Sequence, residues 1–116
     1  MKTREEWLEQ LPDGWRIAFG NQLVDDIIAL VKKHNFENEY EVLQIKEKFG
    51  GLGWYEGRVP PEMYIEHCNL MHDYEHMSYR TCVVCGNAAE APKGMYDQPI
   101  CDECRDNLKR SVKIEN

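Results

Sequence analysis

Long apolar runs are missing from this sequence. Asp25 and Asp26 interrupt the most hydrophobic stretch, residues 23–31, whereas a membrane-spanning helix needs about 18 or more apolar residues in a row. Residues 1–6 are mostly charged and lack the apolar core of a secretory signal peptide. These absences predict a cytoplasmic protein without a membrane segment.

Basic segments and catalytic signatures are missing as well. The chain has 14 Lys and Arg against 21 Asp and Glu, a formal net charge of −7, and no third of it is basic. Because phosphate binding draws on clustered Lys and Arg, this charge disfavours a nucleic-acid partner. The sequence contains no His-Glu-x-x-His motif, glycine-rich phosphate loop or Gly-x-Ser-x-Gly elbow. We therefore expect the protein not to be an enzyme.

The length and composition of the sequence are those of a folded protein. With 116 residues, 42% of them hydrophobic and 30% charged, it is large enough for one modest core or for a small core with an appendage. Apolar residues recur at a spacing of four, which predicts a long amphipathic helix. They are Trp15, Phe19, Leu23, Ile27 and Val31.

Turn signals predict the other elements. Thr3 and Glu6 have capping-box spacing, and Pro12 limits the short helix that follows. The apolar residues on either side of Gly50-Gly51 recur at a shorter period than in a helix, which predicts a β-hairpin. Pro60-Pro61 opens a further helix. The apolar stripe of that helix is Met63, His67, Leu70, Tyr74 and Met77, with Met71 at its edge.

These elements predict an α+β fold in two domains. Residues 1–79 are expected to form an α+β domain, with helices at about 4–10, 15–34 and 61–78 and a β-hairpin at about 40–56. Residues 80–116 are rich in cysteine, glycine and proline at their start. We expect them to form a zinc-binding module with four cysteine ligands, treble-clef-like or zinc-ribbon-like, that ends in a helix.

Two Cys-x-x-Cys pairs carry the clearest chemistry. Cys82 and Cys85 are separated by 15 residues from Cys101 and Cys104, a spacing typical of a zinc site. The odd count of five cysteines and the expected reducing compartment disfavour disulfides. Since four thiolates leave no open coordination position, the sequence predicts one structural Zn²⁺. A hairpin that turns at residues 92–94 is expected between the pairs.

A second metal site is a weaker hypothesis. Cys68, His72 and His76 lie at i, i+4 and i+8 of the last helix in the first domain, and three ligands would leave the open position that a catalytic metal needs. The first and last of them are two turns apart, so a solvated polar face is the favoured interpretation. His67 lies on the apolar stripe instead, which indicates a hydrogen-bonded core histidine.

The hairpin carries the candidate contact surface. Leu52, Trp54, Tyr55 and Arg58 lie beside glycines and can present an apolar surface to a partner, although large aromatics are as often core. Bases can also stack on such rings. A nucleic-acid-binding protein is therefore the second hypothesis, and it requires six cations to share one face: Lys46, Lys48, Arg58, Lys109, Arg110 and Lys113.

Several motifs together resemble one group of proteins. They are Gly14-Trp15, Phe19-Gly20, the run Gln-Ile-Lys-Glu-Lys-Phe-Gly-Gly-Leu at 44–52, Trp54-Tyr55, and both cysteine pairs with their flanks. This pattern is similar to a family of small uncharacterised phage and prophage proteins, whose members usually have Arg where this chain has Gly53. The resemblance implies a bacteriophage or mobile-element origin, a location in the bacterial host cell and a zinc-bound C-terminal module. It implies no activity.

The leading functional hypothesis is a non-enzymatic, zinc-stabilised module that binds a protein. Small acidic phage proteins are sometimes inhibitors of host defence systems, so the expected partner is a bacterial host protein such as a defence factor. The alternatives are the nucleic-acid-binding protein and, least favoured, a metalloenzyme that uses His72 and His76.

Overall fold

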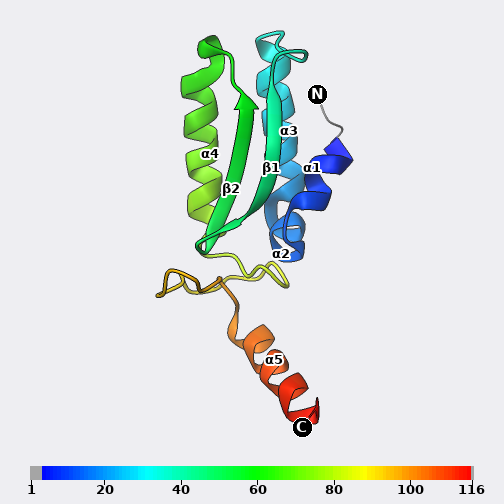
Figure 1. Ribbon diagram of the computed structural model, residues 1–116, viewed down its shortest axis with the longest axis vertical. Coiled ribbons are helices and arrows are strands. Elements are labelled where there is room, and N and C mark those ends of the chain that lie inside the picture. The colour runs from blue at the N-terminus through cyan, green and yellow to red at the C-terminus, as the bar shows by residue number, and fades with distance from the viewer. Residues whose placement is uncertain (1–3, 116) are drawn as a thin grey trace.

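The computed structural model describes the backbone of residues 4–115 and the side chains of residues 4–109. It has two parts, one above the other in Figure 1: helices packed on a two-stranded hairpin, and a loop followed by a single helix. This architecture confirms the predicted α+β class with a C-terminal cluster of four cysteines.

The N-terminal helices supply one side of the core. They are α1 (Arg4–Gln10), α2 (Asp13–Trp15), the π-helical turn η1 (Arg16–Gly20) and α3 (Asn21–Lys33). The residues spaced by four along this segment are all buried, together with Val24 and Leu30. The apolar stripe therefore faces the hairpin and α4, as an amphipathic helix requires. Thr3, the expected cap of α1, lies outside the described residues.

Strands β1 (Glu41–Lys48) and β2 (Gly51–Arg58) form an antiparallel hairpin in which Ile45 pairs with Trp54. Phe49 and Gly50 at its turn both have positive φ, 50° and 91°, as a type I′ turn requires. One face of the hairpin packs on the helices and the other looks out of the page in Figure 1. Because successive residues point to opposite faces, the register decides which aromatic is core.

Both edges of the hairpin are partly blocked. The Gln10 side chain accepts a hydrogen bond from the Ile45 N–H at 3.0 Å, and Ser78 Oγ accepts one from the Leu52 N–H at 2.8 Å. Unpaired N–H groups on an edge invite pairing with another chain. These two bonds make strand addition less favourable at the middle of β1 and at the start of β2.

The second side of the core comes from η2 (Pro61–Met63) and α4 (Tyr64–Ser78). His67 and Tyr74 of the expected stripe are buried, but Met77 is 47% exposed. The prediction for Met77 was wrong because Ser78 takes the inward position at the helix end. Its hydroxyl donates to the Glu75 carbonyl at 2.6 Å while it accepts from β2, so this buried polar group is satisfied.

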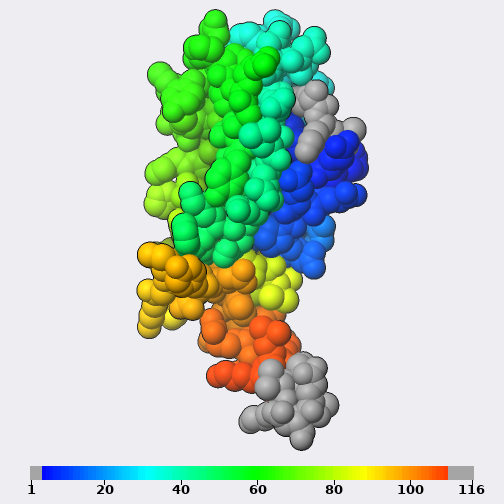
Figure 2. Space-filling model, in the orientation of Figure 1, coloured from blue at the N-terminus to red at the C-terminus, as the bar shows by residue number. Residues whose placement is uncertain are grey.

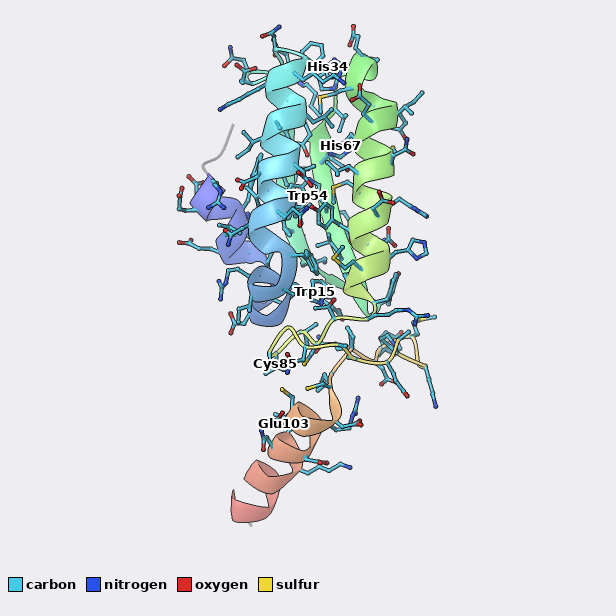
Figure 3. The ribbon with its side chains drawn as sticks, turned by 180° about the vertical axis from the view of Figure 1, so that it is seen from behind. Trp15, His34, Trp54, His67, Cys85 and Glu103 are labelled. Carbon is cyan, nitrogen blue, oxygen red and sulfur yellow. The ribbon has the colours of Figure 1, made fainter. Side chains whose placement is uncertain are left out.

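A chain of hydrogen bonds crosses the core between α4 and the hairpin. Trp54 Nε1–H donates to Tyr40 Oη at 2.8 Å, and that hydroxyl lies 2.7 Å from His67 Nε2. Since the Tyr40 oxygen already accepts from Trp54, its proton is free to donate to His67. His67 Nδ1 then faces Glu56 Oε1 at 3.4 Å. Figure 3 shows Trp54 and His67 between α3 and α4.

The C-terminal part consists of a loop and α5 (Asp102–Glu115). The prediction of a hairpin between the cysteine pairs was wrong, because residues 89–100 form no strand and a single bridge joins Thr81 to Ala88. Pro92 and Pro99 have no N–H to donate to a ladder. The chain turns instead at Gly94, whose N–H donates to Asp97 Oδ2 at 3.1 Å.

We predict that protonation of His67 destabilises the fold. Burial lowers the pKa of His67, against the opposing effect of Glu56. Above the unfolded pKa of about 6.5, His67 is neutral in both the folded and the unfolded state, so protonation takes nothing from the free energy of unfolding. As the pH falls below that value the unfolded state binds the proton first, and the free energy of unfolding decreases by up to about 1.4 kcal/mol per pH unit.

Denaturant unfolding from pH 7.5 to pH 5.0 checks this account. His67→Gln should be less stable at neutral pH but show a flatter pH dependence than the unmodified protein. His76→Gln, at an exposed position of the same helix, should keep the original dependence. Equal pH dependence in all three proteins would contradict the prediction.

Candidate metal centre

The four cysteines of the two pairs come together where the loop meets α5. Cys82 and Cys85 follow α4, Cys101 directly precedes α5, and Cys104 lies in its first turn. All four Sγ atoms lie within 4.8 Å of one another, and those of Cys85 and Cys101 are 3.6 Å apart. Four sulfurs at about 2.3 Å from one central ion are about 3.8 Å apart. The cluster can therefore hold a single metal ion.

Electrostatics in the cluster favours a bound cation. Burial alone would raise the pKa of the Cys82 thiol, but hydrogen bonds from the backbone of Cys101, Cys85 and Val84 outweigh it and lower the pKa to about 6. The pKa of Cys104 is raised, first by its hydrogen bond with Cys101 and then by desolvation. Thiolates this close repel one another, so a positive ion is needed for all four to be charged.

The set of ligands is closed. Four thiolates complete a tetrahedron, whereas catalytic sites keep a position for water or substrate. Gly86, with φ of 85°, makes the bend after the first pair, and the Asn87 N–H lies 3.5 Å from Cys85 Sγ. A metal here can hold the loop against α5, and the geometry offers it no substrate position.

The first cysteine pair is seated on α2. The Gly14 N–H donates to the Val83 carbonyl at 2.7 Å, and the buried Trp15 Nε1–H donates to the Thr81 carbonyl at 2.8 Å. A Cβ on residue 14 would lie 1.9 Å from the Cys82 carbonyl oxygen. Figure 3 shows Trp15 directly above the segment that carries Cys85. Glycine at 14 is thus required for the metal site to contact the helical part.

The hairpin tip makes the second contact between the two parts. A Cβ on Gly50 would lie 2.7 Å from Pro92 Cγ and 3.0 Å from the Asp97 carbonyl oxygen. The rings of Phe49 and Tyr96 pack with their centroids 6.2 Å apart. The loop is therefore held at its ends by the cysteines and in its middle by the hairpin.

The weaker metal candidates do not converge. Within residues 4–109, Cys68, His72 and His76 do not form a group with three ligand atoms close enough for one ion. All three are exposed, and the two histidine rings lie 4.5 Å apart. His67 belongs to the core network. The described side chains thus give the metalloenzyme hypothesis no three-ligand site.

The structure separates the residues of the predicted contact surface. Leu52 and Trp54 are 6% and 7% exposed, so they belong to the core and cannot meet a partner. Tyr55 is half-buried on the outer face, and Arg58 is exposed at the far end of β2. The physical reason is strand alternation, which places residues 52 and 54 on the helix side.

The six cations do not share one face. Lys46 and Lys48 lie over the Tyr55 ring, each with Nζ 5.5 Å from its centroid. Arg58 lines a different hollow with three glutamates, and Lys109 lies on α5, which points away from the hairpin in Figure 1. The side chains of Arg110 and Lys113 lie outside the described residues. Of the predicted nucleic-acid surface, Lys46, Lys48 and Tyr55 lie together among the described side chains.

Sequence reasoning missed two features of the site. One is the seat formed by Gly14 and Trp15, although this pair stood out in the motif. The other is the exposed group of Phe49, Met95 and Tyr96, which are 53%, 65% and 85% exposed. Phe49 gave a signal, because a large apolar residue directly before Gly50 is unusual in a turn that favours Asn-Gly.

We predict one metal ion per chain, bound by the four clustered cysteines. Cys82→Ser and Cys104→Ser should each lose the ion, because three thiolates bind it more weakly and the loop loses its anchor. Cys68→Ser, at the exposed fifth cysteine, is the matched control and should keep it. Native mass spectrometry gives the count; retention of metal by Cys82→Ser would contradict the assignment.

We also predict that Gly14→Ala destabilises the fold by about 2–3 kcal/mol, since the added methyl group overlaps backbone atoms that cannot move away easily. Gly20→Ala is the matched control, because its Cβ would lie 3.2 Å from the flexible ends of Leu8 and Leu11. It should be neutral or stabilising in this helical segment. Denaturant unfolding measures the free energy of unfolding of both variants. Equal effects of the two substitutions would contradict the close contact between Gly14 and the first cysteine pair.

No helix among the described residues is both long enough and apolar enough to cross a membrane. Comparisons of the chain with protein-family models, with curated proteins and with solved structures found no match.

Proposed function

We propose that the cysteine cluster binds Zn²⁺ and that this ion is structural. Tetrahedral sets of four sulfurs are typical of zinc or of iron, and the closed set at the junction of the two parts suits an ion that stabilises folding. The sulfur distances fit one ion rather than a polynuclear cluster. Elemental analysis should return zinc; iron in the protein purified with its native metal would contradict the proposal.

In this proposal the ion holds the loop in place, and the loop forms part of a surface that binds a partner protein. The surface is the junction patch, which we define as Phe49, Met95 and Tyr96. It joins the hairpin tip to the loop that the cysteines hold, and Figure 2 shows these two segments, in green and orange, meeting on one face. Phe, Tyr and Met are enriched at protein interfaces, which makes this exposed group a candidate contact surface.

One observation carries the proposal: Phe49 is both strained and exposed. Its φ of 50° lies in the left-handed region, which costs an L-residue roughly 1–2 kcal/mol. The side chain is not a core residue, because 53% of Phe49 is exposed. A strained residue at a position where asparagine would fit better is a reason to look for function.

The resemblance to phage proteins adds the proposal that the partner is a bacterial host protein, such as a component of a defence system. A protein partner is favoured over nucleic acid because the net charge of −7 repels a polyanion. The protein would then act by occupying its partner and not by catalysis.

Phe49→Asn tests whether the patch is functional. Asparagine tolerates positive φ, and Asn-Gly is the preferred type I′ pair, so this variant should be at least as stable as the unmodified protein. It should nevertheless lose the partner, because aromatic anchors dominate interface energies. Ile65→Ser, which removes an apolar side chain that is 73% exposed on α4, is the matched control and should retain it.

Affinity capture from bacterial lysate, with the zinc-loaded protein as bait, provides the measurement. A partner retained by the unmodified protein and by Ile65→Ser, but not by Phe49→Asn, supports the proposal. If Phe49→Asn captures the same proteins, or if it unfolds more easily than the unmodified protein, Phe49 is a structural residue and the proposal fails.

A further inference from the structure

A basic platform lies next to the junction patch. Lys46 and Lys48 are exposed on the outer face of β1, and their ammonium groups flank the Tyr55 ring, each 5.5 Å from its centroid. The ring has room there because Gly53 has no side chain; a Cβ on it would lie 2.9 Å from Tyr55 Cε2. The cation–π contacts hold both charges close together on one surface.

The platform and the patch share one hollow. A cavity of about 240 Å³ is lined by both lysines, by Glu47 and by the three residues of the junction patch. Glu47 is the acidic group in this lining, and its Oε1 accepts a hydrogen bond from Gln98 Nε2 at 3.4 Å. That bond ties the carboxylate to the loop. The hollow therefore combines two positive charges and one negative charge with a group of exposed apolar side chains.

We propose that this hollow binds an extended segment of the partner protein in which acidic side chains stand beside a large apolar one. This inference rests on the proposed function and names the chemistry of the partner. Carboxylates of the segment pair with Lys46 and Lys48, while its apolar side chain packs on Phe49, Met95 and Tyr96. The recognition is through side chains, because Gln10 occupies the Ile45 N–H in the middle of β1 and Ser78 occupies the Leu52 N–H at the start of β2.

Charge separates this occupant from the others. A peptide brings a few carboxylates to the one local pair of lysines, whereas a nucleic-acid strand brings a row of phosphates against a chain of net charge −7. A second copy of this chain carries the same net charge of −7, so two copies repel each other at long range. The local lysine pair thus fits a short acidic segment better than a polyanion or a dimer.

Selection from a displayed library of random linear peptides, with the full zinc-loaded chain as target, tests the inference. The selected peptides should be enriched in Asp and Glu next to aromatic or branched apolar residues. For a synthetic copy of one selected peptide, Lys46→Glu with Lys48→Glu should weaken binding about tenfold at low salt and less at high salt. Tyr96→Ser should weaken it at least tenfold.

The matched control is a second double variant that reverses two lysine charges far from the hollow. Lys32→Glu with Lys109→Glu, at exposed positions on α3 and α5, gives the same net charge and should leave the affinity within about twofold, because only screened long-range effects remain.

Every other outcome overturns the inference. These outcomes are selected peptides without acidic enrichment, no selection above background, equal weakening by both charge reversals, binding of single-stranded DNA or RNA through Lys46 and Lys48, and self-association that Tyr96→Ser abolishes. The proposed function is judged separately. If Phe49 is needed for capture of a partner while the peptides show no acidic preference, the proposed function stands and the inference falls.

Discussion

The close approach of α2 to the first cysteine pair is the contact on which the other features of the structure depend. Only a residue without a side chain fits at position 14, where a Cβ would meet the Cys82 carbonyl oxygen at 1.9 Å. The Gly14 N–H and the Trp15 indole then bind the backbone on either side of that cysteine. Because these bonds come from the helical core, the metal ligands are fixed to the α+β part. The loop between the two cysteine pairs is positioned by these ligands at its two ends.

Through this arrangement a metal ion at the four cysteines would influence residues beyond its ligands. Residues 89–100 form no strand of their own, and a segment without regular structure loses much conformational entropy when it is fixed. A metal ion at the four cysteines and the contacts of the hairpin tip at Gly50 would together offset that cost. Met95 and Tyr96 are then held beside Phe49, whose strained backbone is set by the turn. The proposed surface thus exists only where both parts meet.

The sequence predicts those features that are set by local patterns. Spacing identifies the cysteine pairs and the long amphipathic helix, because both depend on residues close in the chain. It cannot tell whether Trp54 or Tyr55 is core, since both are aromatic and the strand register decides. It cannot reveal the seat on Gly14 either, because that contact joins residues 14 and 83. The predicted hairpin between the pairs does not form because Pro92 and Pro99 have no N–H to donate to a ladder.

Hydrogen exchange with and without a strong chelator, under reducing conditions, tests most directly whether the metal fixes the loop to the core. Removal of the metal should speed exchange in residues 82–109, at Gly14, whose N–H is bonded to Val83, and around the hairpin tip. Amides of α3 and of the middle of β1 should stay protected, because their bonds lie within the helical part. Unchanged exchange in residues 82–109, or loss of protection confined to the cysteines, would contradict the account.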